Sequence, residues 1–536
     1  MPTDCISYQN SGYFTSLMND YLNQKNELTS LYNRFPSLEN FEAQIEEKKA
    51  NFNTTNKRQI LVSVLEQQYS NLNVSPETLN NIKQLNSPNT FTVTTGHQLN
   101  LFSGPLYFLY KIISTINLSN ELKSKYPEYN FVPVYWMATE DHDFEEINYF
   151  SFKGKKFHWN KESAGPVGRL STDGLDDFLK IFTQEIGHST NAETIKKLFE
   201  DSYIKHNNLT DATRHLANSL FGEYGLVIID ADNKDLKRIF IPYLKDELLR
   251  QTSFKSVTET IKNLKDYSVQ VNPREINLFY IEDNLRKRII LDPDSNQGEI
   301  YKVNHTQIQF TEAEILSLLE SNPEKFSPNV IMRPLYQEVI LPNLCYIGGG
   351  GEIAYWLELK SFFDAVNVTF PMLLVRNSVL LTTKKFNKKA DNLNLSWADL
   401  FSKQANLINQ ITNRLSDYPI DFEEQKTALR KQFDTLLELA NHTDKSFLGA
   451  VKAQEVKQIK GLENLEKRLL IAQKRKFHDE LQRVIDLQNE LFPNQSLQER
   501  QVNFSEFYLE NGEQLIPTLM NQLNPLANNF NIIELY

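Results

Sequence analysis

The chain has 536 residues, a formal net charge of −11 at pH 7 and a pI near 5.5. Because one hydrophobic core rarely serves so long a chain, two or three domains are expected. The acidic balance argues against nucleic acid or an anionic membrane as a partner, although a local basic pocket for phosphate is compatible with it.

Cys5 and Cys345 are the two cysteines of the sequence. Their small number fits a reducing compartment and excludes a disulfide scaffold. The first residues, MPTDCISYQN, lack a basic stretch followed by an apolar one, and no apolar run approaches the roughly 18 residues that span a bilayer. We therefore expect a cytoplasmic protein.

Residues 1–90 combine polar residues with apolar ones at helical spacing, so we expect a helical lead-in that packs on the core. Ser75 followed by Pro76 is a typical helix start, with serine at the N-cap and proline in the first turn. The expected helices lie near residues 12–26, 39–51, 56–70 and 75–85.

Residues 91–150 are expected to begin a Rossmann-like core. Phe91–Thr95 has the β-branched residues of a strand, Gly96 is expected to form a tight turn, and the apolar residues after it have helical spacing. Strand, glycine turn and helix form the first unit of a nucleotide-binding sheet, in which backbone N–H groups at the helix start receive a phosphate. The next strand, Phe131–Met137, ends in the acidic run 140–146, where the ligand crevice of an open α/β sheet lies.

The middle of the chain indicates an insertion followed by the rest of the core. Residues 151–220 alternate short strands and helices, as expected of a region that caps the sheet, and residues 221–390 carry the remaining core with a mixed insertion. The expected elements are a strand at 225–232, a helix at 234–251, a hairpin of 278–281 with 288–291, a helix capped by Thr311, strands at 344–347 and 369–375, and a helix at 353–363.

Residues 391–492 predict a long α-helical arm. Apolar residues recur every three or four positions among Lys, Glu and Gln, and proline is missing from residues 420–492, which is typical of an antiparallel coiled coil. Gly449 and Gly461 are candidate points for a break. Residues 493–536 carry enough aromatic and aliphatic residues to return to the core.

His97 and the acidic run after the second core strand are the first candidates for chemistry. At the expected start of a helix, the His97 imidazole is placed to bind phosphate or to stabilise a departing pyrophosphate, and the alternative is a helix cap. Glu140, Asp141, His142 and Asp143 bring together groups that bind a divalent cation, an ammonium group or hydroxyls, and the alternative is a solvated loop. Zinc is disfavoured because neither cysteine lies near a histidine in the sequence.

Gly348–Gly351 remove side chains between a strand and a helix, where a ligand or another backbone approaches closely. They match neither the phosphate loop nor the dinucleotide fingerprint, which disfavours ordinary NTP hydrolysis. Glu352, Tyr355 and Trp356 begin the next helix and are expected either to line a pocket or to pack. Cys345 is expected to pack as a small apolar residue, because no base lies beside it in the sequence.

Five sequence motifs together resemble those of one family. The chain combines TGHQ at 95–98, LFSGPLY at 101–107, EDHDFEE at 140–146, Arg333-Pro334 and GGEIAYW at 350–356. In this order, and with the later coiled coil, they resemble the BshC family of bacillithiol biosynthesis, described as cysteine ligases, over nearly the whole chain. The resemblance implies a Rossmann-like core with connecting-peptide insertions, akin to class I aminoacyl-tRNA synthetases and nucleotidylyl transferases, and a coiled-coil arm that helps to form a homodimer. It also implies a reaction that joins L-cysteine to the amino group of glucosaminyl-malate.

The class I signature H-x-G-H is matched in part. Thr94 stands at the first histidine, while Gly96 and His97 match. In that class a lysine-rich loop stabilises the negative charge that develops on pyrophosphate. In this chain only the lysine pairs Lys384-Lys385 and Lys388-Lys389 are candidates for that role. The route by which the cysteine carboxylate is activated therefore stays open.

The leading hypothesis is a ligase that uses ATP or another adenine nucleotide to activate cysteine. The alternatives are a nucleotidyltransferase for another small substrate and a non-catalytic nucleotide-binding scaffold whose arm is the working surface. No residues are assigned to a metal. The expected catalytic residues are His97, Asp141, His142 and Asp143, the nucleotide-binding residues are Thr95, Gly96, His97, Gly349, Gly350 and Gly351, and the substrate-binding residues are Gln98, Glu140, Glu352, Tyr355 and Trp356.

Overall fold

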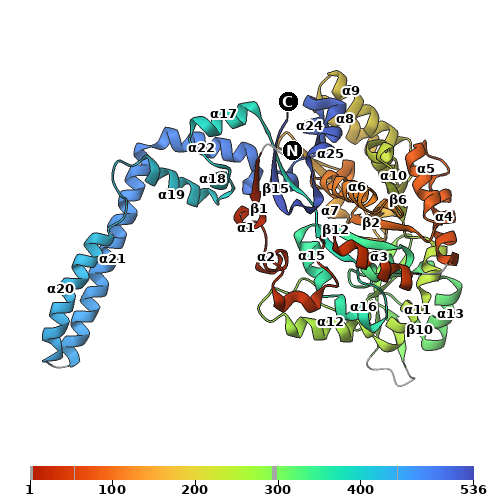
Figure 1. The fold of residues 1–536 in the computed structure, drawn as a ribbon, viewed down its shortest axis with the longest axis horizontal. Coiled ribbons are helices and arrows are strands. Elements are labelled where there is room, and N and C mark those ends of the chain that lie inside the picture. Colours follow the sequence, from red (N-terminus) through yellow and green to blue (C-terminus); the bar gives the residue numbers. More distant parts are fainter. Residues whose placement is uncertain (1–3, 53–54, 293–298, 444, 536) are drawn as a thin grey trace. The chain divides into compact units, whose positions relative to one another are not determined.

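The computed structural model describes residues 4–52, 55–292, 299–443 and 445–535 (Figure 1). The chain forms two compact units, one of Met1–Leu381 with Gln498–Tyr536 and the other of Thr382–Leu497. Within the described residues, no helix combines the length and the apolar character that crossing a membrane requires.

A five-stranded parallel sheet forms the centre of the first unit, in the order β13-β12-β2-β3-β6. The chain moves outward from β2 to β3 and β6 on one side, then continues on the other side with β12 and β13. The strand order therefore reverses between β2 and β12, which is where open α/β sheets bind their ligands. The α/β, Rossmann-like prediction is confirmed. The strands are β2 Thr90–His97, β3 Asn130–Met137, β6 Val227–Asp230, β12 Asn343–Gly348 and β13 Met372–Val375.

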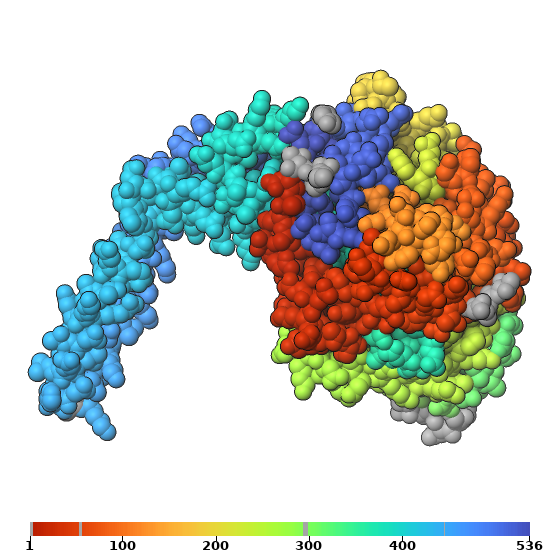
Figure 2. Space-filling view, in the orientation of Figure 1, coloured from red at the N-terminus to blue at the C-terminus, as the bar shows by residue number. Residues whose placement is uncertain are grey.

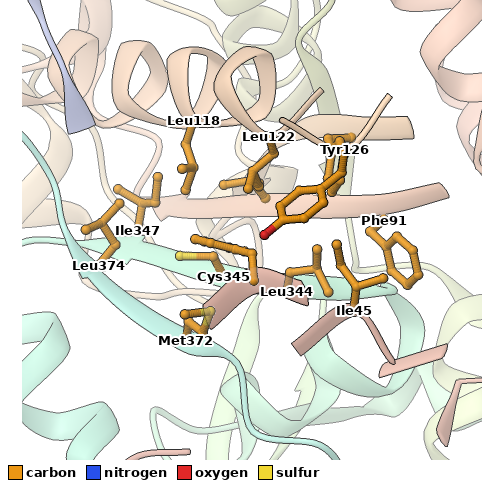
Figure 3. Packing of buried hydrophobic residues seen from close by; sticks show 13 residues of the cluster. Ile45, Phe91, Leu118, Leu122, Tyr126, Leu344, Cys345, Ile347, Met372 and Leu374 are labelled. Carbon is orange, nitrogen blue, oxygen red and sulfur yellow. The ribbon is translucent and has the colours of Figure 1, made fainter. Parts of the chain in front are cut away.

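The helix α6, Tyr107–Lys125, packs over this sheet (Figure 3). Leu118 and Leu122 on its inner side contact a buried cluster from four strands, and Figure 3 shows both side chains pointing toward the strands. Cys345 lies fully buried in the cluster, where burial raises the pKa of its thiol well above the usual value. It packs as a small apolar side chain, as predicted. The strand members of the cluster are Phe91, Val93, Phe131, Leu344, Cys345, Ile347, Met372 and Leu374.

The turn predicted at Gly96 is wrong. Gly96 lies inside β2, paired with Trp136 of β3, and the strand continues through His97. The chain turns instead at residues 102–104, which have positive φ angles, and α6 begins at Tyr107. His97 therefore ends a strand and does not begin a helix. A Cβ on Gly96 would lie 3.1 Å from the Tyr346 hydroxyl, so close approach, and not a turn, requires glycine there.

The lead-in is helical, as predicted, and packs on the first unit (Figure 2, red to orange). The Ser75 hydroxyl accepts a hydrogen bond from Thr78 N at 3.1 Å, which confirms the predicted cap. A strand that was not predicted, β1 at Asp4–Ser7, pairs with β15 at Asn529–Leu535 near the other end of the chain. The C-terminal segment Gln498–Tyr536 thus belongs to the first unit. The lead-in helices are α1 Tyr8–Ser11, α2 Ser16–Leu22, α3 Asn40–Asn51, α4 Thr55–Tyr69 and α5 Pro76–Gln84.

Between β3 and β6 the chain forms a hairpin and three longer helices. The hairpin, β4 Tyr149–Phe152 with β5 Lys155–His158, lies where short strands were predicted. Aromatic rings from the hairpin and from two of the helices pack together around Phe182. The helices are α8 Leu175–Ile186, α9 Thr190–Phe199 and α10 Leu209–Phe221.

The mixed insertion forms a second five-stranded sheet, β10-β9-β8-β7-β11. Its predicted hairpin is confirmed, and the Thr311 hydroxyl caps the next helix by accepting from Glu314 N. The helix α14, Met332–Ile340, was not predicted, and the helix predicted at 353–363 is divided in two. The elements are α11 Lys234–Arg250, α12 Thr252–Asn263, β7 Leu278–Glu282, β8 Leu285–Leu291, β9 Ile300–Val303, β10 Gln309–Thr311, α13 Glu312–Ser321, β11 Phe326–Pro328, α15 Gly350–Leu357 and α16 Lys360–Ala365.

The second unit contains the predicted coiled-coil arm. Helices α20 and α21 run side by side (Figure 1) and bury Phe433, Ala440 and Val451 between them. Neither Gly449 nor Gly461 breaks the arm, because α21 continues through both. The main helices are α17 Lys384–Asn392, α19 Gln404–Leu415, α20 Glu423–Asn441, α21 Lys445–Lys476 and α22 His478–Leu491; β14 Ser378–Thr383 precedes them, and α24 Phe504–Asn511 and α25 Leu515–Gln522 follow.

Candidate functional site

A cavity of about 1040 Å³ opens at the carboxyl ends of β2, β3 and β12, where the strand order reverses. It brings together three parts of the sequence that are far apart: the end of β2, the acidic run after β3 and the glycine loop after β12. The predicted site residues that line it are Gly96, His97, Gln98, Glu140, Asp141, His142, Asp143, Gly349, Gly351, Glu352 and Tyr355.

Three predicted residues lie behind the lining. The Thr95 hydroxyl donates to the Ile347 carbonyl oxygen at 2.8 Å and so joins β2 to β12. A Cβ on Gly350 would lie 3.3 Å from the ring of Phe14, so this glycine faces the lead-in. Trp356 is fully buried and stacks on Tyr346 at 4.4 Å between ring centroids.

His97 is a buried, neutral imidazole. Its side chain is 7% exposed, and burial, together with the charges of Lys111 and Arg376, holds its pKa well below the usual value. A hydrogen bond with the Ser103 backbone favours the protonated ring, so the ring nitrogen in that bond is the donor. The Nε2 atom has no hydrogen-bond partner among the described residues. In the neutral ring, Nε2 is then a buried proton acceptor without a partner among the described residues, in a residue that lines the cavity.

Thr94 occupies the position of the first histidine of the H-x-G-H signature and joins two strands there. Its hydroxyl donates to Asn343 Oδ1 at 2.8 Å, within the buried seam between β2 and β12. Since Thr94 is fully buried and is not among the residues that line the cavity, this position supplies no functional group to it.

Lys111 and Glu352 form the inner end of the cavity. Lys111 Nζ lies 2.6 Å from Glu352 Oε2 and donates to the Gly96 carbonyl oxygen at 2.6 Å. Glu352 also accepts from Gly349 N at 2.8 Å and from the Tyr346 hydroxyl at 2.9 Å. The carboxylate therefore already satisfies a backbone N–H of the glycine loop. The sequence signal for Lys111 was a lysine inside an otherwise apolar helix, between Tyr110 and Ile112.

Arg333 brings an unneutralised positive charge to the same wall. No carboxylate lies within ion-pair distance of it among the residues that the structure describes, and its Nη2 atom is buried without a hydrogen-bond partner. Its guanidinium lies 5.6 Å from the rings of both Trp136 and Tyr346. Because a buried guanidinium needs acceptors, this group is arranged to receive an anionic ligand.

The acidic run forms the opposite wall. Although burial favours the neutral carboxyl, hydrogen bonds from His142 and Gln98 and the charge of Arg286 lower the pKa of Asp141 to about 2. Arg286 Nη1 lies 2.7 Å from His142 Nδ1. Since a guanidinium only donates, this Nδ1 accepts, and the His142 proton is on Nε2. Asp141 is thus a fixed negative charge, suited to an ammonium group.

Glu140 belongs to a network behind this wall. Its carboxylate lies 2.6 Å from Lys237 Nζ, and Lys237 also lies 3.1 Å from Asp232. Arg169 donates twice to Asp232, at 2.8 and 3.1 Å. With its charge engaged in this way, Glu140 anchors the end of β3 to α11.

Asp141, His142 and Asp143 have ligand atoms within 4.8 Å of one another, a spacing that suits a metal ion. Arg286 already donates to His142 and lies 3.8 Å from Asp141, so a protein cation lies beside two of these three residues and disfavours a metal ion there.

The lining is positive on balance, although the chain is acidic. Seven cationic side chains and five carboxylates line the cavity. Of these cations, only Arg333 belongs to a recognisable sequence motif, and the others are scattered along the chain. Their positive excess indicates an anionic ligand. The cations are Lys111, Arg274, Arg286, Arg288, Arg333, Arg376 and Arg500.

The comparisons with known proteins cover the whole chain. Residues 1–377 match the family model "Bacillithiol biosynthesis BshC, N-terminal Rossmann-like domain" and residues 379–535 match "Bacillithiol biosynthesis BshC, C-terminal coiled-coil domain". Among the relatives, each named "Putative cysteine ligase BshC", the protein of Flavobacterium johnsoniae is 72% identical over 100% of both chains. That of Christiangramia forsetii is 59% identical over 99% of both chains, and that of Bacillus cereus is 27% identical over 96% of this chain and 97% of its own. The chain belongs to the BshC family of bacillithiol biosynthesis.

Proposed function

We propose that the protein is a ligase that joins the carboxylate of L-cysteine to the amino group of glucosaminyl-malate, with ATP as the activating nucleotide. In the balanced reaction an amide C–N bond forms, one carboxylate oxygen leaves with a phosphoryl-containing group of ATP, and the amine loses a proton. The observation that carries the proposal is full-length membership of the BshC family together with a net-positive cavity at the switch point of the sheet.

The cavity has groups suited to each reactant. Arg333, with Nη2 unpartnered among the described residues, would hold the polyphosphate, whose oxygens supply the acceptors that a buried guanidinium requires. Bound ATP would make one carboxylate oxygen of cysteine a good leaving group. Asp141, which stays ionised, would bind the ammonium form of the acceptor, which loses one proton before it attacks and a second as the amide forms.

His97 suits the proton transfer. An amine must lose its proton as it attacks the activated carboxyl carbon, and the neutral ring presents Nε2 as an acceptor. The same neutrality argues against His97 as a positive charge for phosphate. Gln98, the next residue, donates to Asp141 Oδ2 at 3.1 Å and so links the proton acceptor to the amine-binding carboxylate.

The direct test is to incubate the full chain with cysteine, glucosaminyl-malate, ATP and Mg²⁺, and to detect the amide by mass spectrometry. His97→Ala is expected to lower the rate at least about 100-fold, the lower end of general-base catalysis. His188→Ala, at a side chain that is 87% exposed, is the matched control and should leave the rate unchanged. The nucleotide product, ADP or AMP, reports which phosphorus is attacked.

Two results would overturn the proposal. One is failure to form amide under all nucleotide and metal conditions. The other is pyrophosphate release that does not depend on cysteine, which would favour a nucleotidyltransferase.

We also propose that the arm joins two copies of the chain. Leu436, Leu439, Val456 and Leu465 on α20 and α21 are 43 to 59% exposed, and such side chains along a coiled coil favour a second helix pair as partner. Sedimentation velocity should show a dimer that Leu465→Glu dissociates. Leu249→Glu, at a 45% exposed leucine of α11, is the control. A monomeric wild-type chain would contradict this.

A further inference from the structure

One wall of the cavity is formed by the inner face of the hairpin β7–β8. Arg286 and Arg288 lie two residues apart on β8, so their side chains project from the same face, about 7 Å apart along the strand. Phe279 of β7 pairs with Arg288 across the hairpin, and all three residues line the cavity. Lys287, between the two arginines, belongs to the other face and is not among the lining residues.

The first of these arginines is fixed in place. Arg286 is 8% exposed, its guanidinium lies 4.1 Å from the Phe279 ring centroid, and it donates to Ser327 Oγ and to the Pro328 carbonyl oxygen, both at 3.3 Å. Four anchors therefore hold it, His142 being the fourth. A guanidinium held in this way loses little conformational entropy on binding a carboxylate.

The second arginine is not neutralised. Within the described part of the chain, no hydrogen bond or ion pair involves the Arg288 side chain, and Arg274, another lining residue, has no carboxylate within ion-pair distance. By contrast, Lys111 and Arg376 of the same lining are paired with Glu352 and Glu499. The hairpin face thus carries positive charge that is available to a ligand.

We propose that this face, Arg286 and Arg288 of β8 with Phe279 of β7 beside them, is the subsite for the dicarboxylate end of the acceptor. The inference rests on the proposed function, because that acceptor carries a malyl group with one carboxylate at each end of a four-carbon chain. Two guanidinium groups on one strand face supply positive charge for two carboxylates, and Arg288, unpartnered among the described residues, has all its N–H donors available for a planar, two-point contact.

The placement also gives the acceptor a direction. Arg286 lies 3.8 Å from Asp141, Asp141 accepts from Gln98 at 3.1 Å, and Gln98 is next to His97 in the sequence. With its carboxylates on the hairpin, the acceptor directs its sugar amine along this path toward Asp141 and the proton acceptor His97. The malyl group thus acts as an anchor that orients the reacting amine.

Binding is the test, because it does not require turnover. Isothermal titration calorimetry with the full chain, without cysteine or ATP, measures the Kd of glucosaminyl-malate and of methyl glucosaminide, which lacks the malyl group. Arg288→Gln is expected to weaken glucosaminyl-malate at least tenfold and to leave methyl glucosaminide unchanged. Lys287→Gln, on the opposite face of the same strand, is the matched control and should change neither. Arg288→Lys, which keeps the charge but loses the two-point contact, should give an intermediate loss.

The proposal is overturned if Arg288→Gln binds glucosaminyl-malate like the wild type, if both ligands weaken equally, or if the wild type gains no affinity from the malyl group. Failure of this subsite and failure of the proposed function are distinguishable. Malate-dependent binding without amide formation would refute the ligase and support the subsite. If amide formed but Arg288→Gln bound glucosaminyl-malate with unaltered affinity, the ligase would be supported and the subsite refuted.

Discussion

Lys111 on α6 and Glu352 on α15 form an ion pair, with 2.6 Å between Nζ and Oε2. The pair joins the helix that follows β2 to the helix that follows β12, which are the two sides of the point where the strand order reverses. Although burial opposes it, Lys111 lowers the pKa of Glu352, so the carboxylate is charged at neutral pH. This contact holds Gly96 and Gly349 together at the inner end of the cavity.

Removing the cation of this pair should destabilise the first unit. Lys111→Met leaves the Glu352 carboxylate, whose side chain is 28% exposed, without its cation, and we expect a loss of roughly 3 kcal/mol in the free energy of unfolding. Urea denaturation followed by circular dichroism measures it. Lys180→Met, at a lysine side chain that is 70% exposed, is the control and should change little. Similar losses in the two variants would contradict the role of the pair.

His97 should make stability depend on pH. The pKa of His97 in the folded state lies well below the unfolded value of about 6.5. As the pH falls through that value, the His97 imidazole becomes protonated in the unfolded chain and stays neutral in the folded chain. The wild type should therefore lose about 1 kcal/mol of stability between pH 7.5 and 5.5 through this one group. In His97→Gln that part of the slope should vanish, as measured by urea denaturation at each pH. If the free energy of unfolding changed with pH in the same way in His97→Gln and in the wild type, this prediction would be refuted. His188→Gln serves as the control.

Gly96 should not tolerate a side chain. A Cβ there would lie 3.1 Å from the Tyr346 hydroxyl and 3.7 Å from Arg333 Nη1, and Tyr346 in turn donates to Glu352. Gly96→Ala is expected to lower the ligation rate at least tenfold and to reduce the thermal midpoint of unfolding.

A glycine with free space around it provides the contrast. Gly461 lies inside α21 with no atom within 4 Å of a Cβ, so Gly461→Ala should stabilise that helix by about 1 kcal/mol. Equal effects of the two alanines would show that helix or strand propensity, and not the Tyr346 contact, decides the outcome.

The sequence predicted most of the sheet, because strands buried on both faces have continuous apolar runs such as Phe131–Met137. It also placed the acidic run at the carboxyl end of β3, where the cavity lies. The error at Gly96 has a physical cause. The freedom of glycine is a local property, whereas the need for it here comes from Tyr346, which lies 250 residues later in the chain.

The cationic residues that line the cavity could not be predicted from local sequence patterns. Arg286 and Arg288 lie on a short strand whose alternation is visible in the sequence, but the ligand-facing side is set by the pairing of the hairpin. Arg376 has its partner Glu499 in the C-terminal segment, 123 residues away. Nothing local to either residue indicates the pair.

That distant pair gives the last prediction. Arg376 and Glu499 are 4% and 1% exposed, with 2.7 Å between Nη2 and Oε1, and Glu499 also accepts from Val379 N. Glu499→Ala leaves a buried guanidinium and a buried N–H unpaired, so we expect a loss of roughly 3 to 5 kcal/mol in unfolding free energy. Glu490→Ala removes an exposed partner of Lys389 and should cost less than about 1 kcal/mol. If urea denaturation gave similar losses for both, the C-terminal return would not depend on its ion pair; a large difference means that residues 498–536 hold the Arg376 wall of the cavity in place.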